Sequence, residues 1–301
     1  MSAHAASGKG FWPPGPPGLP PGAGPSFARA LWRLASAEVS AGNTVQLLTD
    51  GDTTFAALGE AVRRGVQVRL LTAWIGARGT ARLVRSMREA GVEVRVFNPV
   101  GFTPWFGIFP RDHRKMLAVD GAEALTGGIG IGEQWHRGLI RKRASVWRDT
   151  CVRIAGPAAL DLAAAFARMW GRADERQPRT PRSVLGRESR GVHIDPALCQ
   201  GALVGIVEGE PWRLRVGRSL HLQAAAARRS IWVASAYFVP SFAEVDALTG
   251  AARDGVDVRL LVPSRYDHPW IHRLTRGYYQ RLLRNGVRIW EWNGEIMHAK
   301  T

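Results

Sequence analysis

The chain has 301 residues, 46% of them apolar, which is enough to bury the core of one large domain or two ordinary ones and excludes a disordered tail. It carries 41 Lys and Arg against 25 Asp and Glu, and this net charge of +16 favours an anionic partner such as phospholipid headgroups, nucleic acid or a phosphorylated substrate. Two cysteines are too few for a disulfide framework or a zinc cluster, and no apolar run is long enough for a membrane span, so we expect a cytoplasmic chain with peripheral membrane contact at most.

Helices and strands alternate along the predicted fold. Residues 1–25 include FWPPGPPGLPPGAGP and are predicted to form a flexible Pro/Gly-rich arm. The predicted helices that follow are 26–39, 57–62 and 78–90, and the predicted strands are 44–48, 66–71 and 92–97. This β-α-β order indicates an α/β fold with a mostly parallel sheet and right-handed crossovers.

The same order returns in the second half of the chain. Residues 57–71 align without gaps on residues 247–261, with ten of fifteen positions identical, and residues 91–97 match residues 286–292. An Arg/Pro/Ser-rich stretch, 171–200, lies between the copies and is predicted to be a solvated linker. The predicted halves are therefore 26–170 and 201–301.

Each copy is followed by a His-x-Lys triplet. His113 and Lys115 follow the first copy, and His298 and Lys300 follow the second. With eight His and only four Lys in the chain, chance predicts about 0.1 such triplets, yet two occur at matching places. Both lie in strand-like contexts, where residues i and i+2 share a face, so we expect His and Lys of each pair to point into one pocket.

Phosphodiester chemistry explains why these residue types are paired. A lysine ammonium binds the non-bridging phosphate oxygens and stabilises the charge that shifts during transfer. A neutral imidazole can attack phosphorus and form a phosphohistidine. A second imidazole can protonate the leaving alkoxide and later accept a proton from the incoming alcohol or water. Two copies supply both roles without a metal or another cofactor.

The residues around the triplets resemble a known family. His113-x-Lys115, followed by Asp120 and Gly127-Gly128, resembles the His-Lys-Asp signature of the phospholipase D superfamily. The segments RDHRK (111–115), TGGI (126–129), WRDT (147–150), YFVP (237–240) and MHAKT (297–301) are most similar to its bacterial cardiolipin synthase branch. The likeness runs from about residue 42 to the end of the chain.

The resemblance implies a fold and a set of roles. The fold would be two tandem phospholipase D-like α/β/α units with mixed, largely parallel sheets. By resemblance, His113 is the nucleophile, His298 is the general acid/base, and Lys115 and Lys300 clamp the phosphate. No cofactor or metal is implied.

Supporting residues also follow from the resemblance. Asp120 belongs to the signature and is expected to support the geometry of the motif, as are Gly127 and Gly128. Asp149 is a candidate to orient a catalytic imidazole. The family continues Gly-Gly-x-Asn, but Gly130 stands at the Asn position here, which removes one phosphate donor and predicts reduced activity.

Two further departures concern the length of the chain. The second copy begins with a predicted helix and strand at 220–239 for which the first copy has no good counterpart, so one such unit is missing there. The chain also ends at Thr301, before the Asp and Gly-Ser-x-Asn expected after the second triplet, so the second unit is truncated. Either the chain is a fragment of a longer protein, or it is a degenerate paralogue.

Five more residues are substrate-binding candidates. Tyr237 ends a predicted strand and fits either the core or a pocket mouth. Asp267 and His268 lie in a strand-to-helix loop, where open α/β sheets bind ligands, although ordinary loop solvation also explains them. Trp105 and Phe106 lie in an aromatic insertion beside the first motif and are candidates for a lip that touches acyl chains or the bilayer interface.

These observations predict a phosphatidyltransferase of cardiolipin synthase type that acts through a phosphohistidine. Its partners would be a phosphatidylglycerol-like donor and acceptor and the anionic inner face of the cell membrane. One alternative is a phospholipase or nuclease of the same superfamily, since the motif binds the phosphodiester and not the rest of the substrate. Another is a catalytically degraded protein that binds anionic membrane or nucleic acid.

Overall fold

The computed structural model describes residues 25–48, 54–73, 81–97, 112–130, 147–173, 199–209 and 214–301. The described residues fall into two compact units. The His298 unit holds those of Met1–Ala41, Arg143–Thr150 and Leu203–Thr301, and the His113 unit holds those of Gly42–Lys142 and Cys151–Ala202. The candidates Trp105 and Phe106 lie outside the described residues. The predicted arm also lies outside them except for Pro25, as does the predicted linker except for residues 171–173 and 199–200 at its two ends.

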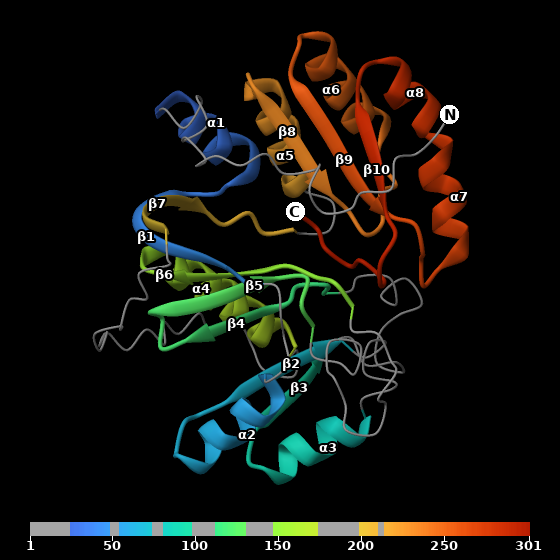
Figure 1. Ribbon diagram of the computed structural model, residues 1–301. Coiled ribbons are helices and arrows are strands. Elements are labelled where there is room, and N and C mark those ends of the chain that lie inside the picture. Colours follow the sequence, from blue (N-terminus) through green and yellow to red (C-terminus); the bar gives the residue numbers. More distant parts are fainter. Residues whose placement is uncertain are drawn as a thin grey trace. The chain divides into compact units, whose positions relative to one another are not determined.

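Two sheets belong to the His113 unit, apart from residues 39–41 and 203–205 of two of their strands. Strands β2 (Arg69–Ala73) and β3 (Glu93–Phe97) form a parallel pair. Helix α2 (Thr54–Arg63) precedes β2, and helix α3 (Ala81–Glu89) connects β2 to β3. Strands β1 (Val39–Leu48), β4 (Met116–Val119), β5 (Glu123–Gly127), β6 (Cys151–Ala155) and β7 (Cys199–Gly205) form a five-stranded sheet in the order β4-β5-β6-β1-β7 (Figure 1). The pairs β4/β5, β5/β6 and β6/β1 are antiparallel. One sheet is therefore parallel and the other is antiparallel in these three pairs, and the parallel pairing belongs to the repeated segment.

Helix α4 (Pro157–Arg172) packs on β4, β5 and β6. Its N-cap residue, Gly156, has no side chain to accept from the first turn. Asn43 of β1 does this instead, because its fully buried Oδ1 accepts from the Ala158 amide at 2.9 Å. At the other end of α4, the Arg95 guanidinium of β3 lies 4.3 Å from the ring centroid of Trp170.

The His298 unit is built on a parallel three-stranded sheet. Its order is β10-β9-β8, from β8 (Ser230–Ala234), β9 (Asp257–Pro263) and β10 (Arg288–Trp292). The helices are α1 (Pro25–Ala35), α5 (Arg215–Ala226), α6 (Phe242–Arg253), α7 (Pro269–Gly277) and α8 (Tyr279–Arg284). Val258, Leu260 and Val262 alternate along β9 and are almost fully buried, and with Val245 and Leu282 they form the core. This parallel arrangement is visible in the orange and red part of Figure 1.

The register of the strands confirms the internal repeat. Arg69 pairs with Glu93 in the His113 unit, and the aligned residues Arg259 and Arg288 pair in the His298 unit. The two copies also match at the glycines that precede the paired strands. The aligned glycines at 65 and 255 have φ of 86° and 86°, and those at 91 and 286 have φ of 91° and 88°. Each ends a helix in the left-handed conformation that glycine adopts without a Cβ clash.

Several predicted boundaries were wrong. The predicted helix 26–39 ends at Ala35, and β1 begins at Val39 rather than at residue 44. The predicted strand 66–71 begins only at Arg69, because residues 64–65 form the turn after α2 and residues 66–68 connect that turn to the strand. The strand-like segment 295–301 forms two isolated bridges instead of a continuous ladder. Within the described ranges, no helix has both the length and the apolar composition needed to cross a bilayer.

Candidate active site

The second motif lies between two other segments of the His298 unit and bonds to both. On one side, the Arg148 amide donates to the Ile296 carbonyl at 2.9 Å, and the Arg148 carbonyl accepts from the His298 amide at 2.7 Å. On the other side, Ala234, at the end of β8, exchanges two backbone hydrogen bonds of 2.7 and 2.9 Å with Thr301. The main chain around His298 is therefore fixed from both sides, although it belongs to no regular strand.

Asp149 holds the His298 ring. The carboxylate is 1% exposed, and its Oδ2 lies 2.8 Å from His298 Nδ1. Its other oxygen, Oδ1, accepts from the Thr150 amide at 2.8 Å. A buried carboxylate can only accept, so these partners assign the Nδ1–H tautomer to the neutral ring and leave the lone pair on Nε2.

Lys300 points at the same ring. Its Nζ lies 2.9 Å from His298 Nε2, 3.1 Å from Nδ1 and 2.7 Å from the His298 carbonyl oxygen. The ammonium is also 5.5 Å from the ring centroid of Tyr237. The ammonium therefore lies beside the imidazole, where it could bind a phosphate oxygen while the imidazole exchanges a proton with an adjacent oxygen.

Two aromatic rings flank His298. The Tyr237 centroid is 5.8 Å from the imidazole in an edge-on contact, and the Trp147 centroid is 5.3 Å away in a tilted one. Sequence reasoning gave Trp147 no role. Its position two residues before Asp149 was the available signal, because alternate residues of an extended segment share a face.

Tyr237, Asp267 and His268 are brought together by the loops after β8 and β9. The Tyr237 hydroxyl donates to both oxygens of Asp267, at 2.9 and 2.8 Å. His268 Nε2 lies 3.7 Å from Asp267 Oδ2, and its ring centroid is 6.4 Å from that of Tyr237. Burial raises the pKa of the Tyr237 hydroxyl, and the bond to Asp267 raises it further, so the phenol stays protonated.

The first motif lies in the extended segment before β4 in the His113 unit. His113 is exposed, and the Lys115 Nζ donates to the His113 carbonyl at 3.0 Å. The Lys115 carbonyl accepts from the Thr126 hydroxyl at 3.2 Å and from the Gly127 amide at 3.3 Å. These bonds hold the His-x-Lys segment against the Thr-Gly-Gly segment, although eleven residues separate Lys115 from Thr126.

Asp120 and the glycines occupy structural positions around this motif. Asp120 and Gly121 have φ of 51° and 65°, and the Ala122 amide donates to the Val119 carbonyl at 3.0 Å, which defines a type I′ turn between β4 and β5. An aspartate tolerates this left-handed conformation better than most side chains do. Asp120 therefore shapes the hairpin that carries Lys115.

Three glycines lie at the end of that hairpin and directly after it. Gly127 ends β5, opposite Cys151, and Gly128 is buried directly after it. Gly130, which stands where the resemblance expects Asn, follows two residues later and provides no side-chain donor.

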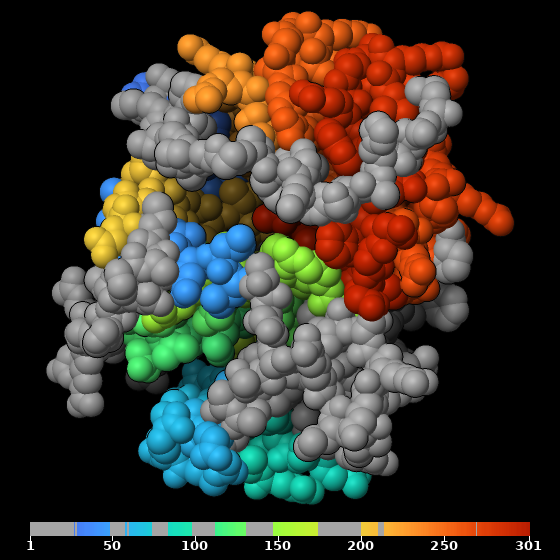
Figure 2. Space-filling view, in the orientation of Figure 1, coloured from blue at the N-terminus to red at the C-terminus, as the bar shows by residue number. Residues whose placement is uncertain are grey.

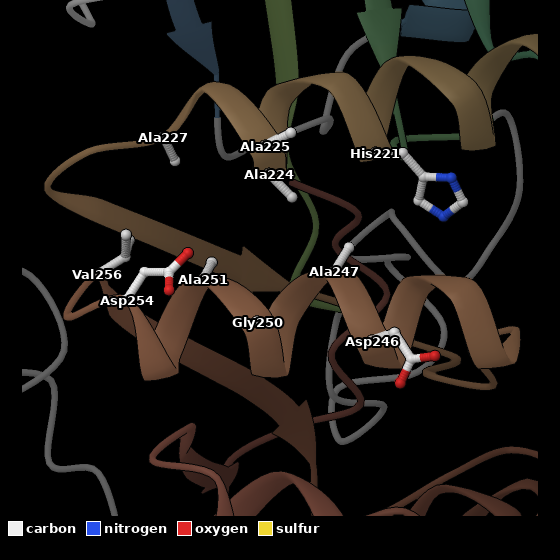
Figure 3. A pocket seen from close by; sticks show the side chains of 10 residues that line it. All are labelled: His221, Ala224, Ala225, Ala227, Asp246, Ala247, Gly250, Ala251, Asp254 and Val256. Carbon is white, nitrogen blue, oxygen red and sulfur yellow. The ribbon is translucent and has the colours of Figure 1, made fainter.

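A groove of 230 Å³ lies elsewhere in the His298 unit, between α5 and α6 (Figure 3). Small residues such as Ala224, Ala247 and Gly250 open it, and His221 and Asp246 lie on opposite helices toward one end. None of the residues described above lines it.

A duplicated α/β unit in which each copy carries a His-x-Lys pair defines a phospholipase D-like chain. A family model described as "Cardiolipin synthase, PLD-like domain" matches residues 31–170 and 221–301. The chain therefore belongs to this family.

Individual relatives agree with this assignment. Cardiolipin synthase of Alkalihalophilus pseudofirmus is 32% identical over 79% of this chain and 46% of the relative. Cardiolipin synthase of Halalkalibacterium halodurans is 28% identical over 90% of this chain and 59% of the relative. Cardiolipin synthase A of Pseudomonas fluorescens is 31% identical over 90% of this chain and 61% of the relative. The chain thus spans about half the length of the curated relatives it matches.

Proposed function

We propose that this chain is the phospholipase D-like part of a phosphatidyltransferase of cardiolipin synthase type. The donor is a phosphatidylglycerol-like lipid, and the acceptor is the glycerol headgroup of a second one, at the cytoplasmic face of the cell membrane. The observation that carries the proposal is the buried Asp149 carboxylate bonded to His298, with the Lys300 ammonium against the same ring, 2.9 Å from Nε2 and 3.1 Å from Nδ1. This arrangement fits a general acid/base beside a phosphate.

Transfer proceeds in two displacements. His113 attacks the phosphorus of the donor, forming a phosphorus–nitrogen bond as the phosphorus–oxygen bond to the glycerol headgroup breaks. His298 supplies the proton that the leaving alkoxide needs. In the second displacement, His298 accepts the proton of the acceptor hydroxyl as its oxygen attacks phosphorus, and the bond to His113 breaks. The lipid product and free His113 result.

The remaining residues stabilise charge and hold geometry. Lys115 and Lys300 bind the non-bridging oxygens, whose negative charge shifts during each displacement. Asp149 stabilises the protonated His298 ring through Nδ1. The hairpin turn at Asp120, and the bonds from Thr126 and Gly127 to the Lys115 carbonyl, position the first His-x-Lys segment.

Loss of either imidazole tests the proposal. His113→Asn and His298→Asn should each abolish release of glycerol from phosphatidylglycerol, while His221→Asn, outside the site, should retain it. The wild type should keep its activity in EDTA and should accumulate a phosphorylated histidine at position 113, detectable by mass spectrometry after acid-free digestion. Dependence on added metal, or full activity of His113→Asn, would overturn the scheme. Transfer to water alone would assign a phospholipase instead.

A further inference from the structure

Large apolar side chains face solvent at the carboxyl-terminal edge of the parallel sheet in the His298 unit. Phe242, the first residue of α6, is 77% exposed, and Trp270, the second residue of α7, is 60% exposed. Val239 and Leu274 are 46% and 45% exposed. We call these four residues the apolar edge. Isolated exposed apolar residues are ordinary, but several large ones on adjoining segments mark an interaction surface.

Hydrogen bonds hold together the segments that carry the apolar edge. β8 and β9 are adjacent and parallel, so the loops that follow them leave the same edge of the sheet. The Thr275 hydroxyl of α7 donates to the Phe238 carbonyl at 2.9 Å, directly beside Val239. The Tyr237 hydroxyl donates to Asp267 of the next loop. The segments that carry the four apolar residues are therefore held together by hydrogen bonds.

A series of ring contacts leads from the candidate active site to this surface. The Tyr237 ring is 5.8 Å from His298, the His268 ring is 6.4 Å from Tyr237, and the Trp270 ring is 6.4 Å from His268. All four residues belong to the His298 unit. The exposed indole thus lies two ring contacts beyond the aromatic residue that touches the catalytic imidazole.

Arginine side chains accompany the apolar edge. Residues 269–284, which form α7 and α8, contain four arginines and no acidic residue. Arg276 pairs with Glu291, and Arg281 pairs with Asp246. Among the described residues, Arg273 makes no ion pair, and it is exposed on α7 three residues after Trp270, a spacing that places the two side chains side by side. Side chains of the segment that includes α7 project at the right-hand margin of the space-filling view (Figure 2).

We propose that the apolar edge and Arg273 form a docking surface for an anionic phospholipid bilayer, which brings the phosphodiester of a membrane lipid to His298. Indole and phenyl rings are stable at the level of the headgroups, and a guanidinium beside them gains from the negative surface potential. This inference rests on the proposed function, because a lipid substrate must reach His298 from a bilayer. The inference adds the surface by which the protein binds the bilayer.

Vesicle sedimentation tests the surface with the full chain. The double variant Phe242→Ser/Trp270→Ser should bind vesicles of phosphatidylcholine and phosphatidylglycerol about tenfold or more weakly than the wild type. Trp32→Ser, which removes a similarly exposed indole (55%) from α1, is the matched control and should bind like the wild type. Trp270→Phe, which keeps an aromatic ring at this position, should bind vesicles more strongly than the double variant. That result would attribute the weak binding of the double variant to lost apolar area and not to misfolding. Arg273→Gln should reduce the preference for phosphatidylglycerol vesicles over pure phosphatidylcholine vesicles by about fivefold.

Turnover of a short-chain phosphatidylglycerol below its micellar concentration separates this proposal from the catalytic one. The double variant should keep wild-type turnover of that monomeric substrate while losing binding to vesicles. Wild-type vesicle binding by the double variant, or loss of binding in Trp32→Ser to the same extent, would overturn the docking surface and leave the catalytic proposal intact. A wild type that binds vesicles through this surface but turns over no substrate would overturn the catalytic proposal alone.

Discussion

Replacing Asp149 by asparagine should damage the site more than its small change in volume suggests. Asp149 Oδ1 accepts from the Thr150 amide, and Oδ2 accepts from His298 Nδ1. Asparagine has only one oxygen. The main-chain N–H of Thr150 requires that oxygen, so the amide NH2 group must face Nδ1. A donor at Nδ1 moves the ring proton to Nε2, where the lone pair is needed.

The size of the effect follows from the bond that is lost. A hydrogen bond to a charged group contributes about 1.5–3 kcal/mol, and the one from His298 is nearly solvent-free because Asp149 is 1% exposed. At about 1.4 kcal/mol per factor of ten, this corresponds to a loss of roughly 10- to 150-fold in kcat. The wrong tautomer adds to that loss. Asp149→Asn should therefore be less active than Asp149→Ala, which removes the carboxylate without placing a donor at Nδ1.

Two measurements check this prediction. Release of glycerol from phosphatidylglycerol gives kcat, and proton–nitrogen correlation spectra of the 15N-histidine-labelled protein show which nitrogen of His298 carries hydrogen. Asp257→Asn is the matched control, because Asp257 pairs with Arg259 and Arg288 at the amino-terminal end of β9 and makes no contact with His298. An Asp149→Asn variant that keeps more than a tenth of wild-type kcat, or that keeps the Nδ1–H tautomer, would refute the reasoning.

Two further predictions concern stability. Burial raises the pKa of Tyr237, Tyr266 and Tyr279, so a spectrophotometric titration should detect their phenolates in the folded protein only above pH 10. Stability should fall as pH rises past about 10, because the unfolded chain loses these protons there while the folded protein keeps them. Formation of these three phenolates near pH 10 in the folded protein would contradict the prediction. Gly286→Ala should lower the free energy of unfolding by about 1 kcal/mol, because Gly286 has a φ of 88° that alanine adopts only with strain. Gly250→Ala, inside α6 with open space around it, should raise the free energy of unfolding by about 0.5–1 kcal/mol. Chemical denaturation measures both, and equal effects of the two substitutions would exclude the backbone explanation.

The repeated parts of the fold were predictable because their determinants are local. Apolar periodicity located the α-β units, and glycines 65, 91, 255 and 286 marked the helix ends where a left-handed residue is required. Matching the two copies also predicted which residues of the paired strands would be equivalent, and the registers confirm it. The proximity of His298 and Lys300 was predicted from their i, i+2 spacing in an extended segment, although that segment forms no regular strand.

Non-local partners were not predictable in this way. The antiparallel pairing of β1 with β6 joins residues more than a hundred positions apart, and no periodicity encodes it. Asn43 caps α4 from another strand, so the cap of that helix has no signal in its own segment. Tyr237 and Asp267 were separate candidates, each with an alternative explanation, until the loops placed them in one hydrogen bond.

The proximity of residues 147–150 to His298 bears on how a duplicated protein diverges. The imidazole of the second copy depends on a carboxylate encoded 149 positions earlier, and that carboxylate belongs to the same compact unit as the second copy. The two halves have therefore ceased to be interchangeable modules. A second half inherited alone would carry His298 without Asp149, the carboxylate that fixes the position of the ring proton. Selection for the function of the second half therefore also acts on codons in the first half.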